Sequence, residues 1–403
     1  YQAKLPLERL ILDEAPGEEG VPMDVVFVGG GPAGLAGAIR LAQLVKGDPA
    51  LAELEIGVLE KAEELGQNNL SGAVVNPRSL RQLFPDLADS DLPLRQPVEA
   101  ERVYILEEEK ARKIPTPGSM DNHGNFTASL CEIVRWLGEQ AEGLGVNLFT
   151  GFPADSLLVQ DGAVVGVRTT PSGLNRDGEP GGGYAPPTDL GARVVALAEG
   201  CRGPLTQAWL EKEGIGAANP QLVALGVKEI WETKADLDHV IHTVGWPVPK
   251  DAFGGAFVYP LEKGLIALGL VVGMDWKQTN VDVHLLTQKL KLHPLVKPLL
   301  EGGELLEWGA KTIPEGGYHA LPERLAGDGL VLLGDAAGFL DVPSLKGIHY
   351  AIQSGIEAAE AIFEALKKDD VSAAGLAAYD TRMRESYVVE DLRRTRNVRL
   401  AFK

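Results

Sequence analysis

The stretch DVVFVGGGPAGLAGAIRLAQL, residues 24–44, decides the fold of this chain. Residues 24–28 form a largely apolar run that is typical of a buried strand, and the residues after Gly34 repeat apolar side chains at helical spacing. Between them, Gly29, Gly31 and Gly34 fit the G-x-G-x-x-G pattern. In this pattern the first glycine allows a tight turn, the second lets the backbone approach a pyrophosphate, and the third packs helix on strand. The stretch therefore predicts a strand–turn–helix unit that binds a dinucleotide.

An acidic residue at the end of the next apolar run supports this prediction. Glu60 ends EIGVLE and lies 26 positions after Gly34 (60 minus 34), near the roughly 20 expected for a ribose-binding acid. An acid rather than an arginine favours an unphosphorylated ribose, as in FAD or NAD. A purely structural glycine turn is the weaker alternative, because the motif follows a strand and opens a helix.

A segment far down the chain favours FAD over NAD. A strand ending in Gly334 and Asp335 puts a carboxylate where the ribityl hydroxyls of a flavin can bind. A helix that begins near Lys346 and Gly347 would direct its positive end at the flavin. The simpler alternative is that Asp335 only caps a helix.

A third segment of the same kind contains Glu199 and Gly200, after the buried run RVVALAEG. Three separated segments that converge on one dinucleotide indicate FAD. No second G-x-G-x-x-G follows a strand, so the sequence predicts no separate NAD(P)H site.

Composition excludes several classes of protein. The chain has 403 residues, 45% of them hydrophobic, and a net charge of -19, which argues against nucleic acid and against a polybasic grip on lipid. Two cysteines, Cys131 and Cys201, are too few for a disulfide framework and suit a reducing compartment. No apolar run reaches the roughly 20 residues that span a bilayer, so we expect no transmembrane helix. Because the sequence starts at Tyr1 rather than Met, we expect its true beginning to lie upstream.

The pattern along the chain predicts an α/β fold with a second domain inserted in the first. Residues 221–312 alternate long strands with a helical stretch, whereas the segments before and after them resemble each other. We expect a hairpin turn at Asp161 and Gly162, a flexible excursion over 171–191, and helices over 346–368 and 373–394.

The stretch HTVGWPVPKDAFGGAFVYP, residues 242–260, combines glycines with aromatic side chains. Gly254 and Gly255 lie between Phe253 and Phe257, so bare backbone is framed by rings, which suits a flat ligand. The alternative is a bulged strand with no binding role.

Taken together, these motifs resemble the electron transfer flavoprotein–ubiquinone oxidoreductase family. The resemblance covers nearly the whole chain. It rests on GGGPAG with VLEK, LGQNNLSGAVVNP (65–77), MDNHGNF (120–126), LAEGCRG (197–203), HTVGWP (242–247), FGGAF (253–257) and EGGYHALP (315–322). LSGA, HTVGWP and the EGG-aromatic segment are shared only with related nitrogen-fixation flavoproteins, and NHGN with HTVGWP favours the quinone oxidoreductases.

The resemblance implies specific site residues. The implied FAD contacts are Gly29, Gly31, Gly34, Glu60, Ser71, Gly72, Glu199, Gly200, Gly334, Asp335, Lys346 and Gly347. The implied quinone site is the backbone of Gly254 and Gly255, with Phe253, His242 and Trp246 as its walls. No catalytic side chain and no metal ligand is predicted.

The resemblance also implies an architecture and an activity. It implies a glutathione-reductase-like FAD-binding Rossmann domain over 21–98, 129–220 and 313–403, an α+β quinone-binding domain over 99–128 and 221–312, and an N-terminal extension over 1–20. The implied activity is electron transfer from reduced electron transfer flavoprotein to ubiquinone or another quinone. The implied location is peripheral, on the cytoplasmic face of a bacterial inner membrane or the matrix face of the mitochondrial inner membrane.

Two departures from the family pattern leave alternatives open. Family members hold a [4Fe–4S] cluster through four cysteines, and this chain has two. The cluster domain is therefore outside this sequence, or on a separate ferredoxin-like subunit, or dispensable. Ser129 stands where the family often has a basic residue, which puts one phosphate contact in doubt. The competing functions are an electron-relay subunit with a ferredoxin-like partner and an NAD(P)H-fed flavin monooxygenase or prenyl reductase.

A basic cluster close to the last residue carries one further expectation. We interpret Arg393, Arg394, Arg396 and Arg399 as a solvated helix face rather than a docking site for an acidic partner.

Overall fold

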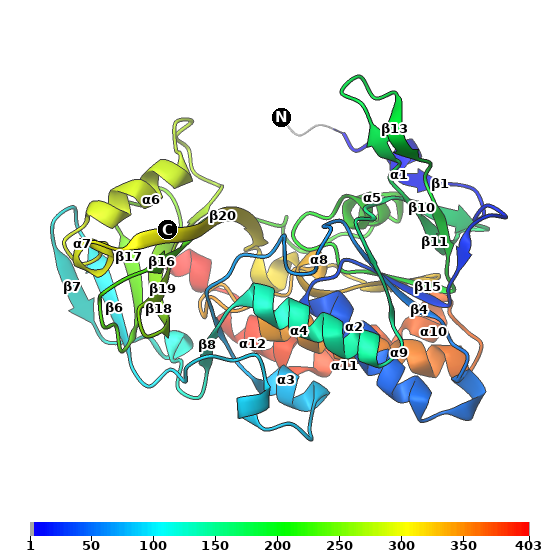
Figure 1. The fold of residues 1–403 in the computed structure, drawn as a ribbon, viewed down its shortest axis with the longest axis horizontal. Coiled ribbons are helices and arrows are strands. Elements are labelled where there is room, and N and C mark those ends of the chain that lie inside the picture. The colour runs from blue at the N-terminus through cyan, green and yellow to red at the C-terminus, as the bar shows by residue number, and fades with distance from the viewer. Residues whose placement is uncertain (1–3, 403) are drawn as a thin grey trace.

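A six-stranded sheet forms the centre of one lobe in the computed structural model, which describes residues 4–402 (Figure 1). Its strand order is β21-β22-β15-β3-β4-β9, and every neighbouring pair except β21–β22 is parallel. The strands are β3 (Val25–Val28), β4 (Ile56–Glu60), β9 (Asn147–Thr150), β15 (Val194–Leu197), β21 (Ala326–Gly327) and β22 (Leu330–Leu332). Parallel neighbours need crossover connections, so this sheet collects segments from the whole length of the chain.

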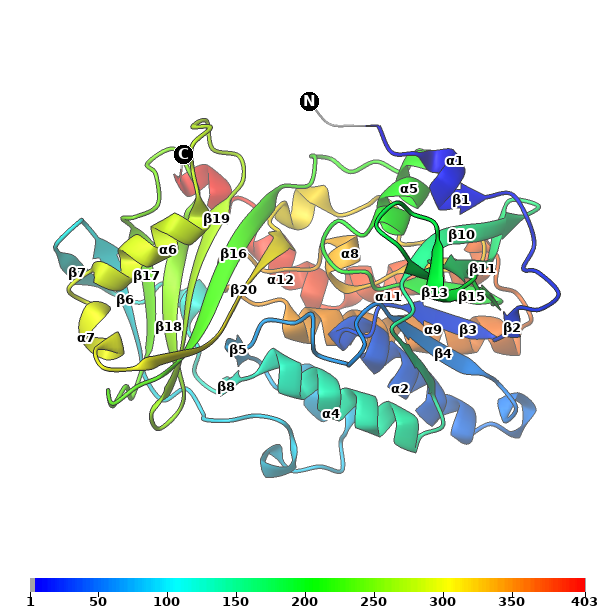
Figure 2. The same cartoon turned by 45° about the horizontal axis from the view of Figure 1, so that its top comes forward.

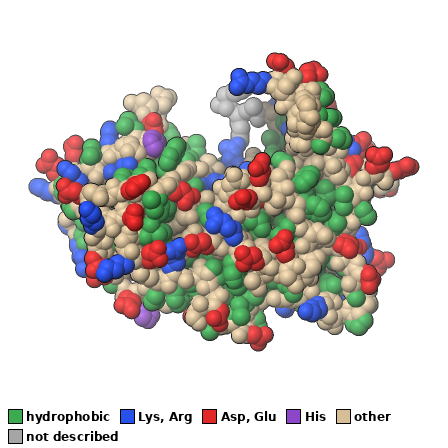
Figure 3. Space-filling model, viewed as in Figure 1, with side chains coloured by type: hydrophobic (Ala, Val, Ile, Leu, Met, Phe, Trp, Pro, Cys, Tyr) green, Lys and Arg blue, Asp and Glu red, His purple; other side chains and the backbone are tan. Residues whose placement is uncertain are grey.

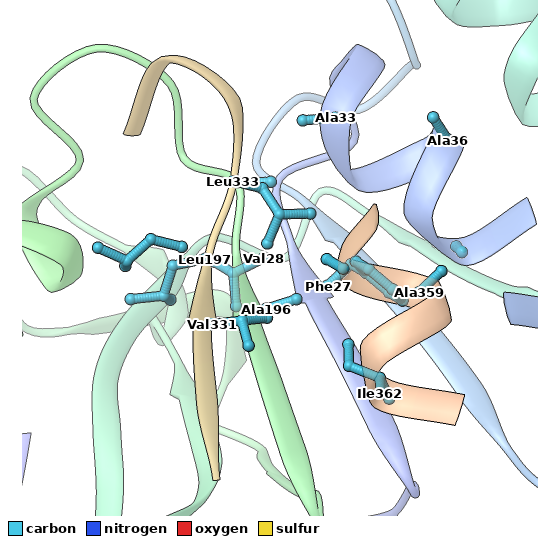
Figure 4. Close-up of a cluster of buried hydrophobic side chains, with 14 of the residues drawn as sticks. Phe27, Val28, Ala33, Ala36, Ala196, Leu197, Val331, Leu333, Ala359 and Ile362 are labelled. Carbon is cyan, nitrogen blue, oxygen red and sulfur yellow. The ribbon is translucent and has the colours of Figure 1, made fainter. Parts of the chain in front are cut away.

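Helices cover one face of this sheet. The stretch after the glycine turn forms α2 (Pro32–Lys46), which packs on α9 (Ile348–Lys367) and on α4 (Leu130–Gly143). Phe27 and Val28 of β3 lie among Ala196, Val331 and Ile362 in the buried cluster that Figure 4 shows. Because β3 is buried on both faces, all four of its residues are apolar, as in other parallel sheets.

The other helices lie around this lobe. They are α1 (Leu7–Leu10), α3 (Arg78–Leu83), α5 (Pro204–Lys212), α8 (Gly334–Ala337), α10 (Ala373–Leu376), α11 (Ala378–Glu385) and α12 (Tyr387–Thr395). The prediction of a single helix over 373–394 is wrong, because that segment is divided among α10, α11 and α12. Ser386 has φ -71° and ψ 156°, an extended conformation that ends α11 before α12 begins.

A five-stranded sheet packs on the opposite side of the lobe. Its strands are β1 (Ile11–Leu12), β2 (Val21–Pro22), β10 (Ala154–Gln160), β11 (Ala163–Thr169) and β14 (Asp189–Gly191). Asp161 and Gly162 both have positive φ, as expected for the two-residue turn between β10 and β11. The excursion expected over 171–191 is partly wrong, because it contains a small hairpin of β12 (Ser172–Leu174) and β13 (Pro180–Ala185).

A seven-stranded sheet forms the second lobe (Figure 2). In order, its strands are β20 (Glu304–Pro314), β16 (Val223–Glu232), β19 (Leu265–Gly273), β18 (Gly254–Glu262), β17 (Val240–Gly245), β6 (Glu101–Leu106) and β7 (Ala111–Ile114). Only the β17–β6 pair is parallel. Strands from 101–114 and 223–314 thus share one sheet. A two-stranded ribbon of β5 (Ala73–Val75) and β8 (Phe126–Ala128) lies between the lobes.

The two faces of the seven-stranded sheet have different roles. On one face, α6 (Val283–Leu292) and α7 (Lys297–Leu300) cover an apolar cluster that includes Leu268 and Leu290. On the other face, Phe257 and Tyr259 belong to a smaller cluster that also contains Val74 of β5. This second face therefore looks toward the first lobe.

The strand register brings three larger side chains to that face. His242 pairs with Phe257, and Phe257 pairs with Gly269. Gly269 in turn pairs with Lys228. Residues paired across a sheet project to the same side, so His242, Phe257 and Lys228 form one row directed at the first lobe.

Acidic side chains are scattered over the molecular face in Figure 3 rather than gathered in one patch. On this face, the acidic side chains that contribute to the net charge of -19 are therefore interspersed with other residues. No helix among residues 4–402 is both long enough and apolar enough to cross a membrane.

The α2–α9 contact generates a stability prediction. A Cβ at Gly355 would lie 2.3 Å from the carbonyl oxygen of Ala33, whereas a Cβ at Gly143, the last residue of α4, would meet no atom within 4 Å. We expect Gly355→Ala to lower the free energy of unfolding by about 1–3 kcal/mol, because the two helix backbones must separate. We expect the control Gly143→Ala to raise it by about 0.5 kcal/mol. Urea unfolding midpoints measure both, and equal effects of the two substitutions would refute the prediction.

Candidate dinucleotide and electron-transfer site

A cavity of about 490 Å³ lies between the two lobes. It is bounded by the glycine turn before α2, the loop over 68–72, the N-terminus of α9, and the inward face of the seven-stranded sheet. Nine of the twelve predicted FAD contacts line it: Gly29, Gly31, Glu60, Gly72, Glu199, Gly200, Asp335, Lys346 and Gly347. The remaining three, Gly34, Ser71 and Gly334, lie outside the lining.

The glycines of the turn have different physical roles. Gly29 has φ +117°, and a Cβ there would lie 2.3 Å from the carbonyl oxygen of Ala198 in the segment after β15. A Cβ at Gly34 would lie 2.1 Å from the carbonyl oxygen of Gly29. Both positions therefore need glycine for packing. A Cβ at Gly31 would meet no atom within 4 Å, so this glycine keeps the cavity open.

The start of α2 offers free backbone donors to the cavity. Gly31 is the N-cap residue and supplies no side-chain cap, and Pro32 occupies the first helical position. The N–H groups of the first turn therefore lack a side-chain partner. Such a helix end binds anions through these N–H groups and the helix dipole.

Glu60 lies beside this turn at the end of β4. Its two carboxylate oxygens accept hydrogen bonds from the backbone N–H of Gly30 (3.1 Å) and of Ala62 (2.8 Å). The carboxylate is thus held in place next to the anion-binding end of α2.

Asp335 is the most distinctive carboxylate of the cavity. It is the second residue of the short helix α8 rather than the end of β22, and it caps no helix, so the capping alternative is wrong. Its carboxylate makes no hydrogen bond within residues 4–402, although its backbone carbonyl accepts from the N–H of Gly338 at 3.1 Å. Burial raises its pKa to about 6, against the opposing charge of Lys311. A partly buried carboxylate without a hydrogen-bond partner is unfavourable for stability, which is typical of a binding position.

The N-terminus of α9 is the second free helix end in the cavity. Gly347 is its N-cap residue and supplies no side-chain cap, so the expected helix start is confirmed to within one or two residues. Beside it, Lys346 is buried and donates to the carbonyl of Ser344 at 2.9 Å. Burial lowers the pKa of Lys346 to about 8, although Asp341 and Glu101 oppose the shift.

Some predicted contacts have partners inside the protein. The Glu199 carboxylate accepts from the backbone N–H and the hydroxyl of Thr206, both at 2.8 Å, and so caps α5. Ser71 points to the start of α4, where its hydroxyl lies 3.0 Å from that of Ser129. Gly334 lies beneath the cavity, because its N–H donates to the hydroxyl of Ser354 at 2.9 Å. Of these three positions, Glu199 lines the cavity, whereas Ser71 and Gly334 lie outside the lining.

Several residues of the seven-stranded sheet line the cavity, among them Phe257, which the sequence had suggested as a wall for a flat ligand, and Lys228 and Tyr259, which it had not placed at a site. Lys228 donates to the carbonyl of Gly72 at 2.9 Å. Burial lowers the pKa of Lys228 to about 8. Alternation within the strand VALGVKEIWE places Lys228 on the same face as Gly226, but the sequence could not show which face meets the other lobe.

The predicted quinone residue His242 lies next to this wall. Its Nε2 is 2.9 Å from the hydroxyl of Tyr259, while its Nδ1 is buried without a hydrogen-bond partner within residues 4–402. Burial lowers the pKa of His242 to about 3, so the ring is neutral. His242 therefore touches the cavity only through Tyr259.

None of the five predicted quinone residues lines the cavity itself. Gly254 and Gly255 are in β18, where an added Cβ would lie 2.3 Å from the Val271 carbonyl oxygen and 2.4 Å from the Thr243 carbonyl oxygen. Substitution of these glycines would therefore disturb strand packing before it affected a ligand. Trp246 packs on His293, with 5.5 Å between ring centroids, away from the cavity. The quinone site stays a prediction.

Arg399 lies next to Phe253 and beside the cavity-lining residue Glu315. It forms ion pairs with Asp275 (2.9 Å) and Glu315 (3.1 Å), and its guanidinium lies 5.0 Å from the centroid of the Phe253 ring. Its side chain is only 16% exposed, so the expected solvated helix face is wrong for this residue. Glu315, a cavity-lining residue, is buried beneath it.

Comparison with known proteins identifies the family. The protein-family model for the ubiquinone-binding part of electron transfer flavoprotein–ubiquinone oxidoreductase (ETF-QO) matches residues 223–313. This range contains five of the seven strands in the second lobe. The electron transfer flavoprotein-ubiquinone oxidoreductase of Oryza sativa is 40% identical over 96% of this chain and 67% of its own length. This chain belongs to the electron transfer flavoprotein–ubiquinone oxidoreductase family.

Other members of the family give the same result. The mitochondrial enzyme of Dictyostelium discoideum is 41% identical over 96% of this chain and 66% of its own length, and the human one is 39% identical over 93% and 63%. The chain thus spans about two thirds of the length of these curated relatives.

Solved structures show how widely the fold is shared. A geranylgeranyl bacteriochlorophyll reductase-like protein from Thermoplasma acidophilum aligns over 95% of this chain and 88% of its own, with a TM-score of 0.73 and 20% identity. A myxobacterial FAD-dependent halogenase covers 95% of this chain and 82% of its own, with a TM-score of 0.65 and 18% identity. At these identities the likeness concerns the mixed α/β fold alone.

Within residues 4–402, no group of three or more His, Cys, Asp or Glu side chains is arranged to hold a metal ion.

The Arg399 contact predicts a pH-dependent loss of stability. Burial raises the pKa of Glu315 to about 7, and Arg399 holds it lower than burial alone would. At pH 5 Glu315 is protonated in the fold, so Arg399→Gln should cost about 1 kcal/mol or less. At pH 8 the same substitution leaves a buried carboxylate without a partner and should cost about 3 kcal/mol.

Urea unfolding at both pH values measures this difference. The control is Arg394→Gln, because Arg394 is 74% exposed and pairs with Asp391 on the surface. An equal loss at pH 5 and pH 8 for Arg399→Gln would contradict the role assigned to Glu315.

Proposed function

We propose that this chain binds FAD in the cavity between its lobes and transfers electrons from reduced electron transfer flavoprotein to ubiquinone or a similar quinone. Family membership supports the reaction. The observation that carries the cofactor assignment is the convergence of two uncapped helix N-termini, those of α2 and α9, on one cavity with the unpaired carboxylate of Asp335.

The residues present fit FAD. Gly31 leaves open space where any side chain would intrude, and the adjacent N–H groups of α2 suit the pyrophosphate. Glu60 lies where it could accept from ribose hydroxyls, and Asp335 could accept from the ribityl chain. The N-terminus of α9 at Gly347 would favour negative charge on the flavin ring. When bound, FAD supplies the capacity to take up and release electrons that amino-acid side chains lack.

The chain's own residues would form the wall beside the cofactor and hold a proton there. Phe257 and Val271 contribute apolar surface to the sheet-side wall, beside the polar side chains of Lys228 and Tyr259. Tyr259 and the neutral His242 share one hydrogen bond, so a proton is held at this wall. Quinone reduction consumes protons, but burial raises the pKa of Tyr259 and lowers the pKa of His242, so this pair retains its proton rather than supplying it.

The finer architecture is part of the proposal. We assign a glutathione-reductase-like FAD-binding domain to 21–98, 129–220 and 313–403, and a quinone-binding domain to 99–128 and 221–312. The two separate large sheets and the family match over 223–313 support this division. We place the quinone near Gly254, Gly255 and Phe253, where Arg399 lies beside the cavity-lining residue Glu315.

The partners follow from the same family. A [4Fe–4S] centre would have to be held outside this sequence, by a further domain or by a ferredoxin-like subunit, because the chain contains two cysteines. A peripheral contact with a respiratory membrane remains a prediction.

Asp335 allows a test of FAD binding that separates folding from function. Its pKa, raised to about 6, means that the ionised carboxylate is unfavourable in the fold above that pH. We expect Asp335→Asn to raise the stability of the ligand-free protein at pH 8 by about 1 kcal/mol, with a smaller gain near pH 4. FAD affinity should fall at least tenfold, because a charged acceptor is lost.

Thermal or urea unfolding and FAD titration measure the two effects. Asp89→Asn is the control, since Asp89 forms a surface pair with Arg81 and lies far along the sequence from the cavity residues. Unchanged FAD affinity in Asp335→Asn would argue against the assigned cofactor position.

An anaerobic assay tests the reaction. FAD-loaded protein should oxidise reduced electron transfer flavoprotein and reduce a soluble ubiquinone analogue, while NADPH should leave its flavin absorbance unchanged. Bleaching by NADPH would instead favour a monooxygenase or prenyl reductase. Flavin reduction without quinone reduction would favour a relay subunit that needs a ferredoxin-like partner.

A further inference from the structure

Four lysines line the cavity, and their surroundings differ. Lys346 has Asp341, Glu101 and Asp121 nearby, and all three offset its charge. Lys311 is exposed and lies near Glu60 and Asp335. The fourth, Lys61, follows Glu60 directly. None of Lys228, Lys311 and Lys346 forms an ion pair within residues 4–402, but Lys228 is the one of these three whose charge no nearby carboxylate offsets.

Lys228 is also the only one of these lysines that comes from the central strands of the second lobe. It projects from β16, part-buried, beside Phe257, whose ring centroid is 5.6 Å from Nζ. One N–H of its ammonium donates to the carbonyl of Gly72. An ammonium has three N–H donors, so two remain for a ligand.

The loop that receives this bond lies directly against the sheet. A Cβ at Gly72 would lie only 2.3 Å from Cβ of Ala267 in β19. The position of Nζ is therefore fixed by two closely packed elements, and its charge faces the cavity rather than solvent.

We infer that Lys228 raises the reduction potential of the FAD proposed for this cavity, by placing one uncompensated positive charge in the wall contributed by the inserted sheet. The inference rests on the proposed function for FAD binding only. Two electrons and one proton convert oxidised FAD to a reduced form that carries one more negative charge. A nearby cation in a medium of low dielectric constant stabilises that form relative to the oxidised one.

The charge of Lys228 also predicts a pH dependence. Because burial lowers its pKa to about 8, Lys228 loses its proton above that pH while the ligand is oxidised. Reduction adds negative charge and raises that pKa, so a proton is taken up at Nζ. The potential should therefore fall more steeply with pH above 8 in the native protein than in a variant without the amine. Cys131 of α4 acts on the charge of Lys228, Tyr259 of β18 and Lys311 of β20 line the same cavity, and the neutral His242 of β17 lies in the same row of the sheet.

The test compares two lysine variants with FAD bound. Lys228→Met removes the positive charge of Lys228. Lys311→Met removes an exposed ammonium group, which donates a hydrogen bond to the carbonyl of Asn68 in the same loop at 2.9 Å. The midpoint potential is measured by equilibrium reduction with dithionite against a reference dye. At a fixed potential and pH 7, Lys228→Met should lower the ratio of reduced to oxidised flavin at least tenfold, or about 30 mV for a two-electron couple. Lys311→Met should change it less than threefold.

Two further variants separate charge from structure. Lys228→Arg keeps the positive charge and should restore most of the potential, and Lys228→Gln replaces Lys228→Met if the latter does not fold. Cys131→Ala should leave the pH dependence unchanged. An equal shift in the two lysine variants, or no recovery with Lys228→Arg, would overturn the inference.

The outcomes also separate this inference from the proposed function. Failure of the native protein to bind FAD would overturn both. FAD binding with an unchanged potential in Lys228→Met would overturn only the role of Lys228. A shifted potential in a protein that reduces no quinone would support Lys228 and overturn the proposed reaction.

Discussion

Close backbone contact at one crossing holds the first lobe together. The turn after β3 passes so near to the segment after β15 that no side chain fits at Gly29, and α2 passes so near to that turn that none fits at Gly34. The same crossing leaves Gly31 facing open space. Packing of the lobe and opening of the cavity thus depend on one geometric constraint. With alanine at Gly29 and Gly34, the strand and the helix would have to move apart whether or not a ligand is bound.

The second lobe packs closely on its inward face because two positions of its sheet are glycine. A Cβ at Gly269 would lie 2.2 Å from the Phe257 ring, and one at Gly309 would lie 2.4 Å from the Leu70 side chain. These glycines let large side chains and the loop over 68–72 lie flat on the inward face of the sheet. The larger side chains of that face, among them Lys228 and Tyr259, then reach the cavity. The sheet therefore contributes polar side chains to the site and also encloses it on one side.

The sequence predicted the elements that are governed by local rules. Apolar runs, the glycine spacing and the helix start near Gly347 needed no knowledge of distant contacts, and the structure has them. The unsuccessful predictions concern partners that are distant in the chain. Nothing local shows that Arg399 is buried against Glu315 and Asp275, or that the lysine in VALGVKEIWE reaches Gly72. The break at Ser386 was also missed, because the preceding Arg384 and Glu385 are good helix formers and no proline or glycine marks the end of α11.

The cavity between the lobes has a consequence for how the protein unfolds. Each lobe has its own buried cluster, and the space between them is lined by residues of both lobes. A ligand that fills this space would contact both lobes at once, so that each lobe would pack against it as it packs against its own buried cluster. Occupancy would then join two structural units into one cooperative unit, and the empty protein would be the state in which the lobes can lose structure independently.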